Sequence, residues 1–367
     1  MNNQSIIYTI IHIILLFFVG QVFLLNELAA QKIKGMSLSG PKKPSFDASM
    51  FEQIKVSNTN WVAFIPEATL DRTTLKLKPD SANNWWSQPI EANIEGIKLA
   101  KQAGFKIFLK PHIVLGEIPK NKVRAIAVAS FSKEKKPKDK TRGVEWRGEM
   151  SFKNEANWQI WENTYETYIL SLAQVAEQLE VDIFSVGTEL KQSTWKRPAF
   201  WRQLIQKVRA IYTGKVIYSA NWDEYHKITF WQDLDYIGVD TYFPISRMAT
   251  PSVKKTLKNW RSIQKDLKQL SKKENRKILL TEFGYRNVAY AGKRPWTHDK
   301  QDNARQNDLA QSNLYEAFFQ AFWKKSWVAG GFAWKWFCNP LPAGNTSFSV
   351  QKKPAFTVLQ QWYAKNE

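Results

Sequence analysis

Two stretches decide the fold: Ser185-Val186-Gly187-Thr188-Glu189 and Leu280-Thr281-Glu282-Phe283-Gly284-Tyr285. In each, a glutamate lies one or two residues beyond a run that is typical of a buried β-strand. Parallel strands that share a barrel end at the same edge, and the side chains just past them point into one pocket. We therefore expect the two glutamates to meet in space, although they are far apart in the sequence.

From Lys32 onward, short β-branched or aromatic runs alternate with longer stretches of helical periodicity, which is the pattern of βα units that build a parallel sheet. Several runs are almost wholly apolar, as expected of strands covered on both faces. Eight strands are predicted, at Ile33–Ser37, Trp61–Ile65, Lys106–Leu109, Asp182–Val186, Lys215–Ser219, Tyr236–Val239, Lys277–Thr281 and Val328–Ala333. Helices are predicted at Phe46–Val56, Ile90–Ala103, Ala156–Gln178, Pro198–Tyr212, Val253–Leu270, Asp302–Lys325 and Phe356–Ala364.

This alternation predicts one large domain. Eight βα units in a chain of 367 residues, with no Pro/Gly/Ser-rich linker between separate halves, favour a single (β/α)8 TIM barrel over residues 31–367. A doubly wound open sheet is the alternative, but Gly35-Met36-Ser37-Leu38-Ser39-Gly40 lacks the glycine-rich phosphate fingerprint of such sheets. We therefore expect the barrel, with room for only a short helix at Asp223–Asp233.

The composition excludes several classes of protein. The net charge is +20, but the lysines are spread along predicted helices, and the one dense run, Lys133–Lys140, is not interleaved with aromatic residues. Because no helix-turn-helix, zinc-finger or RNP-like motif is present, nucleic-acid binding is not expected. The single cysteine, Cys338, and four histidines without metal-ligand spacing predict neither a disulfide framework nor a metal site. No cofactor is expected.

The N-terminal segment predicts export. Ile6–Leu25 is nearly unbroken apolar sequence, and Leu28-Ala29-Ala30 offers small residues where a signal peptidase could cleave. No Lys or Arg precedes the apolar run, which is somewhat long for a signal peptide, so an uncleaved anchor is the alternative. We expect residues 1–30 to be a signal peptide or membrane anchor. The remainder is expected to be a monomer that is periplasmic, at the cell surface or secreted.

A pair of carboxylates at one end of a barrel predicts glycoside hydrolysis. In a retaining glycosidase, two carboxyl groups about 5–5.5 Å apart flank the scissile bond; one attacks the anomeric carbon and the other protonates the departing oxygen. Their pKa values must differ, because the acid stays protonated near neutral pH while the nucleophile stays ionised. The alternative for Glu189 and for Glu282 is a surface ion pair at a strand end. Two such residues at the same end of the barrel favour catalysis.

The longest predicted connection runs from Gly116 to about Asn154, after the third strand, and connections of this length are usually functional or disordered. It ends in Val144-Glu145-Trp146-Arg147-Gly148-Glu149-Met150, which brings an indole, a guanidinium and carboxylates to the face where barrel active sites form. Aromatic faces stack well on the C–H surfaces of sugar rings. Trp146 is therefore a candidate sugar-binding residue, and loop anchoring is the alternative.

Seven short motifs occur in a characteristic order and spacing: Gly35-Met36-Ser37, Lys110-Pro111-His112, Trp146-Arg147-Gly148-Glu149, Val186-Gly187-Thr188-Glu189-Leu190, Gly238-Val239-Asp240-Thr241-Tyr242-Phe243-Pro244, Thr281-Glu282-Phe283-Gly284-Tyr285 and Gly331-Phe332-Ala333-Trp334. Through them the chain resembles the retaining (β/α)8 glycoside hydrolases of clan A. Within that clan it resembles glycoside hydrolase family 113, whose characterised members are β-1,4-mannanases. The resemblance spans Lys32 to Glu367.

The resemblance implies a role for four residues. Glu189 matches the acid/base and Glu282 the nucleophile. Tyr242 matches the tyrosine that hydrogen-bonds the nucleophile, and Trp334 matches the tryptophan under the sugar that is attacked. One position departs from the clan: Thr188 stands where many members carry an asparagine that contacts the 2-hydroxyl of that sugar. Asn221 or a water is expected to supply that contact instead.

The remaining candidates each have a structural alternative. Lys110 and His112, past the third strand, are expected to bind sugar hydroxyls or to support the acid/base, and a core histidine is the alternative. Trp222 and Trp336 are candidates to stack on further sugar units, and core packing is the alternative.

The leading interpretation is an exported, retaining endo-β-glycosidase that acts on an oligo- or polysaccharide, with β-1,4-mannan as the expected polymer. Two alternatives stay open. The basic surface could serve an acidic polysaccharide with the same mechanism, or the barrel could bind carbohydrate without cleaving it.

Overall fold

Eight parallel strands close into a barrel in the computed structural model of the chain, which describes residues 31–40, 46–79, 89–116, 146–297, 305–339 and 341–365. Around the barrel they follow chain order: β1 (Ile33–Ser39), β2 (Trp61–Phe64), β5 (Lys106–Leu109), β7 (Ile183–Thr188), β8 (Lys215–Asn221), β9 (Tyr236–Asp240), β10 (Ile278–Phe283) and β11 (Val328–Phe337). Pairing of β11 with β1 closes the cylinder. The predicted (β/α)8 barrel is confirmed, within one compact unit, Ile33–Lys365.

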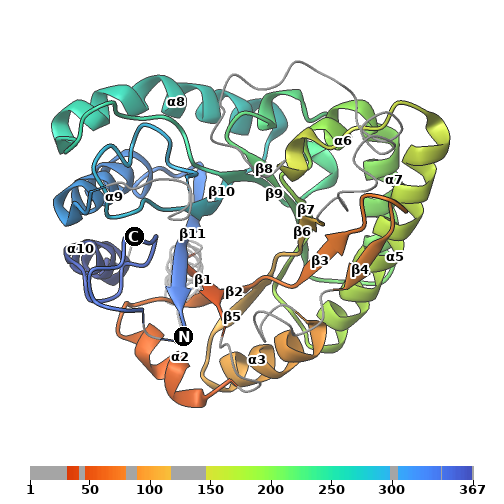
Figure 1. Cartoon of the computed structure of the whole chain (residues 1–367), viewed down its shortest axis with the longest axis horizontal. Helices are drawn as coiled ribbons and strands as arrows, with labels where there is room; N and C mark the ends of the chain where they lie inside the picture. Colours follow the sequence, from red (N-terminus) through yellow and green to blue (C-terminus); the bar gives the residue numbers. More distant parts are fainter. Residues whose placement is uncertain are drawn as a thin grey trace, which may run out of the picture. The chain divides into compact units, whose positions relative to one another are not determined.

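Helices surround the barrel (Figure 1), as expected when a parallel sheet must be covered. They are α2 (Ala48–Lys55), α3 (Ile90–Gln102), α5 (Glu155–Gln178), α6 (Lys191–Lys196), α7 (Pro198–Arg209), α8 (Val253–Glu274), α9 (Asp308–Phe322) and α10 (Pro354–Ala364). In α5, Trp158, Trp161, Tyr165, Tyr168 and Leu172 recur at three- and four-residue steps and form a buried face. None of the helices in the described ranges is long and apolar enough to cross a membrane.

The interior of the barrel changes character along its length. One apolar cluster fills it with Ile33, Trp61, Ala63, Phe108, Ile183, Ile217, Leu279 and Phe332. These side chains come from the beginnings and middles of the strands. Toward the carboxyl ends, the buried residues become polar and include Lys110, Glu189, Asn221, Asp240, Thr281 and Glu282. A second, larger apolar cluster packs the outer face of the barrel against the helices.

A small second sheet was missed by the sequence analysis. It consists of β4 (Leu77–Pro79), β3 (Glu67–Leu70) and β6 (His112–Leu115), in that order. β3 and β6 continue the chain directly beyond β2 and β5, so the sheet extends the carboxyl end of the barrel (Figure 1). Its strands are only three or four residues long, too short to show a clear period.

Several predicted boundaries shift. The strands β7 to β11 run one to four residues further than predicted, and Glu282 therefore lies within β10 and not beyond it. The short helix expected at Asp223–Asp233 is two 3-10 turns, η3 (Tyr225–Lys227) and η4 (Trp231–Asp233). The leader at residues 1–30 and the basic run at residues 133–140 lie outside the described residues.

Candidate active site

Strand alternation places polar side chains inside the barrel at its carboxyl end. Side chains two residues apart share a face of a strand. In β7, Ile183 belongs to the interior cluster, but the pairing with β8 shifts register between Ser185 and Thr188, so alternation alone does not set the direction of Glu189. In β5, Phe108 is interior and Lys110 follows two residues later. The same rule brings Asn221 inward from Ile217 in β8.

Glu282 does not obey this rule, and a β-bulge explains why. In β10, Leu279 is interior, so simple alternation would turn residue 282 outward. The pairing of β10 with β9 shifts register between Leu279 and Glu282, and the pairing with β11 shifts between Leu280 and Phe283. Both Thr281 and Glu282 consequently face the interior, while Phe283 packs in the outer cluster. A bulge of this kind commonly re-aims a side chain next to a functional site.

Glu282 is surrounded by groups that favour its ionised form. The Lys110 ammonium donates to Oε1, and the Tyr242 hydroxyl donates to Oε2 at 2.7 Å. His112 Nε2 lies 3.5 Å from Oε1, which is long for a hydrogen bond. Burial alone would raise the pKa of Glu282, but Lys110 and then His112 lower it below its ordinary value. Glu282 is therefore a carboxylate across the neutral pH range.

Lys110 also holds a second buried carboxyl group. Its ammonium lies 3.0 and 3.1 Å from the two oxygens of Asp240, and Lys110 is completely buried. Thr281 Oγ1 donates to Asp240 Oδ1 at 2.7 Å. Burial first, and then the charge of Glu282, raise the pKa of Asp240 well above its ordinary value. One lysine thus serves two carboxyl groups, and Asp240 is the one that is more readily protonated.

Glu189 has a different environment. Its Oε2 accepts from Arg147 Nη2 at 2.9 Å and from Trp146 Nε1 at 3.2 Å. Burial raises the pKa of Glu189, Arg147 opposes that shift, and the negative charge of Glu282 adds to it; the net change is upward. The backbone of Glu189 is left-handed, with φ 55°, a conformation that costs a non-glycine residue about 1–2 kcal/mol.

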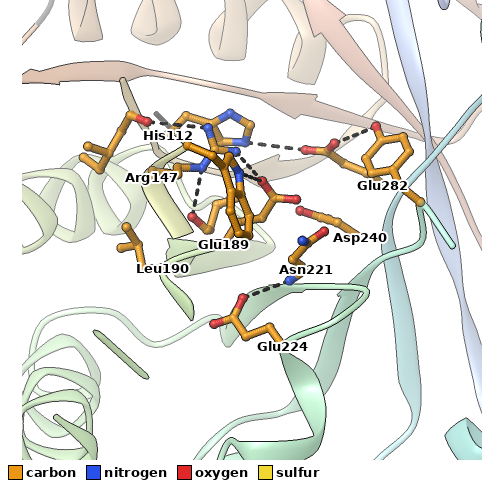
Figure 2. Close-up of polar contacts among 12 residues, drawn as sticks. His112, Arg147, Glu189, Leu190, Asn221, Glu224, Asp240 and Glu282 are labelled. Carbon is orange, nitrogen blue, oxygen red and sulfur yellow. Dashed lines mark hydrogen bonds and ion pairs between the residues drawn. The ribbon is translucent and has the colours of Figure 1, made fainter. Parts of the chain in front are cut away.

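The two glutamates therefore have pKa values that move in opposite directions. Figure 2 shows both carboxyl groups within one cluster, with Arg147 beside Glu189 and His112 near Glu282. When the pKa of one acid is raised and that of its neighbour is lowered, one carboxyl group can donate a proton while the other stays charged. The arrangement can support acid–base and nucleophilic chemistry on a group placed between the carboxyls.

The segment Trp146–Glu149 is held in place by a contact within it and by contacts with Lys191. Gly148 lies against the Trp146 ring, and a Cβ at this glycine would come within 2.1 Å of it. Lys191 joins the segment to the connection after β8, because its ammonium pairs with Glu149 at 2.6 Å and with Asp223 at 3.2 Å. The same ammonium lies 5.3 Å from the Trp146 ring centre. These contacts hold the indole N–H against Glu189.

The aromatic candidates divide into two groups. Trp334 is half-buried at the end of β11, and its ring stacks on His112 with centroids 6.0 Å apart. Trp222 is half-buried and stacks on Trp296 at 5.5 Å. Trp336, in contrast, is buried in the outer core against Phe356 of α10. The structure therefore places Trp336 away from the glutamates, because it packs on the outer side of β11.

The polar candidates also lie in distinct places. Asn221 is buried at the end of β8, and its Nδ2 donates to Asp223 Oδ1 at 2.8 Å. The Thr188 hydroxyl donates to the carbonyl of Pro111 at 3.0 Å, so it is engaged with the backbone. Lys110 and His112 both contact Glu282. Burial first, and then Arg147, lower the pKa of His112 to about 3, so its ring is neutral.

Three residues of this cluster had no predicted role. Asp240 directly follows the predicted strand Tyr236–Val239, so the reasoning applied to Glu189 could have found it. Arg147 lies in the segment that drew attention to Trp146. Glu224, which is fully buried below Asn221, had no sequence signal beyond its place after the fifth barrel strand. Within the described ranges, no group of three or more His, Cys, Asp or Glu side chains could hold a metal ion.

Comparison with known proteins adds a family and a set of structural relatives. The family model of Glycoside Hydrolase Family 113 (GH113) matches residues 42–353. A GH113 β-mannanase from Alicyclobacillus acidocaldarius, in complex with ManMIm, is 21% identical with a TM-score of 0.73, over 91% of this chain and 97% of that one. A GH113 β-1,4-mannanase is 23% identical with a TM-score of 0.69, over 91% and 99%. A β-glucuronidase from Faecalibacterium prausnitzii is 12% identical with a TM-score of 0.58, over 91% and 49%.

At these identities the structural relatives establish the fold, and the family match carries the classification. The chain has no significant match among curated proteins. The match to the family model extends over most of the chain, from the segment before α2 to the residue before α10. The chain belongs to glycoside hydrolase family 113.

Proposed function

We propose that this glycoside hydrolase is a retaining endo-β-1,4-mannanase, with Glu282 as nucleophile and Glu189 as acid/base. The observation that carries the proposal is that two buried glutamates in one cluster have different partners: Glu282 accepts from Lys110 and Tyr242, whereas Glu189 accepts from Arg147 and the Trp146 N–H. Lys110 and Tyr242 hold Glu282 as a carboxylate, which a nucleophile requires. Burial and the neighbouring charge favour a proton on Glu189, which a general acid requires.

The proposed reaction is a double displacement. A Glu282 carboxylate oxygen attacks the anomeric carbon while Glu189 gives its proton to the departing glycosidic oxygen, and a glycosyl ester forms on Glu282. Glu189, now ionised, takes a proton from a water that attacks the same carbon, and the bond to Glu282 breaks. Arg147 and the Trp146 N–H, both within hydrogen-bond reach of Glu189 Oε2, would stabilise its charged form between the two steps.

The aromatic side chains support a polymeric carbohydrate substrate. The Trp334 ring is half-buried beside His112, where it can lie under the sugar that is attacked. The stacked pair of Trp222 and Trp296 offers a second flat surface beyond Asn221. Mannan is the polymer we propose, because two GH113 structures that resemble this chain are described as β-mannanases. An acidic polysaccharide is the second candidate, favoured by the net charge of +20.

The experiment measures release of reducing ends from β-1,4-mannan by Glu282→Ala and Glu189→Gln. We expect both variants to lose activity by orders of magnitude with the native circular dichroism spectrum retained. Glu162→Gln is the matched control, since Glu162 lies on α5, is similarly buried, and pairs with Arg197 just before α7. Native activity in Glu282→Ala would overturn the assignment. Faster release from a uronic-acid polymer than from glucomannan would favour the second candidate.

A further inference from the structure

A buried carboxyl group that the reaction does not use lies directly beneath the acid/base. Glu224 is 0% exposed and follows β8, below Asn221 and near Leu190 (Figure 2). A fully buried glutamate is rare unless its oxygens are well satisfied. Here they are, because the carboxyl group accepts three hydrogen bonds from three different residues. The Glu224 side chain therefore connects neighbouring parts of the protein and is not a group in contact with substrate.

The three donors come from β8 and α6. Tyr218 OH donates to Oε1 at 2.6 Å, and the Thr194 hydroxyl donates to the same oxygen at 2.8 Å. The backbone N–H of Asn221 donates to Oε2 at 2.9 Å. The backbone carbonyl of Glu224 also accepts from Trp195 Nε1 at 3.1 Å. Glu224 thus fastens α6 to the end of β8.

A relay continues from Glu224 to the backbone of the acid/base. The N–H of Leu190 donates to Tyr218 OH at 2.7 Å, and that hydroxyl in turn donates to Glu224. Leu190 is the residue immediately after Glu189, and it is the N-cap of α6. On its other side, the Glu189 N–H donates to the Ser219 carbonyl of β8 at 2.8 Å. Both peptide N–H groups that flank Glu189 are therefore held by β8.

The backbone at Glu189 needs such support. Its φ of 55° lies in the left-handed region, which a non-glycine residue adopts only when the surrounding structure over-determines it. Without the Tyr218 hydroxyl, the buried N–H of Leu190 loses its partner, and the chain can relax toward an ordinary conformation. Such a relaxation would turn the Glu189 side chain, and a displacement of about 1 Å can cost 100-fold in rate.

We propose that Tyr218 and Glu224 are positioning residues, which hold Glu189 in its left-handed conformation through the relay to the Leu190 N–H. The proposal rests on the proposed role of Glu189 as the acid/base. In this proposal the relay orients the general acid. It does not bind the sugar, and it does not assist Glu282.

The test uses two substrates that differ only in their need for an acid. Phenyl and 2,4-dinitrophenyl β-mannobioside share one glycone, but only the phenolate requires protonation as it leaves. For Tyr218→Phe we expect kcat/KM to fall about 10- to 100-fold on the phenyl substrate and to stay within about two-fold on the dinitrophenyl substrate. Tyr212→Phe is the matched control, because its buried hydroxyl donates to the Val181 carbonyl at the other end of β7. It should leave both values at the native level.

A second variant keeps the proposal testable if Tyr218→Phe folds poorly. Glu224→Gln retains an acceptor for Tyr218, so its loss on the phenyl substrate should be smaller than that of Glu224→Ala. The double variant Tyr218→Phe/Glu224→Gln should lose no more than Tyr218→Phe alone, since both act through one relay. Equal losses on both substrates, or no loss on either, would overturn the proposal. Native cleavage of both substrates by Glu189→Gln would instead refute the proposed function on which it rests.

Discussion

The Lys110→Met substitution tests how the pocket keeps its nucleophile charged. Lys110 is completely buried and is the ammonium shared by Glu282 and Asp240. Methionine has a similar length and no charge, so it removes the cation while filling much of the space. Two buried carboxyl groups then remain without their common partner. Both take up protons more readily, and the pKa of Glu282 rises.

The magnitude follows from the contact distance. For unit charges 3.0 Å apart, the separation of Lys110 Nζ and Asp240 Oδ1, Coulomb's law gives about 5.5 kcal/mol at an effective dielectric constant of about 20, and Glu282 lies at least as close to the same ammonium. Since one pKa unit corresponds to about 1.4 kcal/mol, the upper bound is a shift of about 4 units. Opposite charges at this range usually shift a carboxyl pKa by about 1–3 units. We therefore expect the acidic limb of kcat/KM to move up by about 1–3 pH units.

The assay is the pH dependence of kcat/KM, whose acidic limb reports the free-enzyme pKa of the group that must be ionised. Thermal unfolding at several pH values is measured alongside. Loss of one partner of a buried pair costs about 3–5 kcal/mol, and that loss should shrink as the pH falls and the carboxyls become protonated. Lys101→Met is the control, because Lys101 pairs with Glu180 on the outside of the barrel. An acidic limb at the native pH in Lys110→Met would refute the reasoning.

Three further predictions concern single hydrogen bonds and one buried acid. Tyr242→Phe removes the 2.7 Å donor to Glu282, so kcat/KM should fall about 10- to 100-fold, as expected for a bond to a charged group, with the acidic limb moved upward. Trp146→Phe keeps an aromatic side chain but removes the N–H that donates to Glu189, so the pKa of Glu189 and the basic limb of kcat/KM should rise. An unchanged basic limb would contradict this prediction. Burial raises the pKa of Glu224 to about 8, so the native protein should lose stability as the pH rises from about 5 to 8. Glu224→Gln should flatten that decline in urea unfolding.

The fold could be predicted from the sequence because each barrel strand carries an apolar run and each helix carries an apolar stripe. The alternation of side chains in a strand also predicts part of the site. Once Phe108 and Ile217 are known to fill the barrel, Lys110 and Asn221 must face the same interior. The position of the strands in the chain then brings these residues to one end of the barrel.

Two features could not be read in this way. The inward turns of Glu282 and Glu189 depend on register shifts, which are visible only in the pairing of β10 and of β7 with their neighbours. Glu224 lies beyond β8 in a connection of two 3-10 turns, where no strand or helix period sets the direction of a side chain. Both depend on tertiary contacts, because a local pattern cannot show which donors will surround a carboxyl group. The same is true of Trp336, whose spacing from Trp334 predicts a shared face that the structure does not show.

The most direct test of the central claim is proton NMR of the first product released from a β-1,4-linked mannooligosaccharide, recorded before mutarotation. If Glu282 forms a covalent intermediate that water then opens with help from Glu189, the new reducing end must appear first as the β anomer. Initial appearance of the α anomer would show a single displacement by water. That result would contradict the assignment of Glu282 as nucleophile.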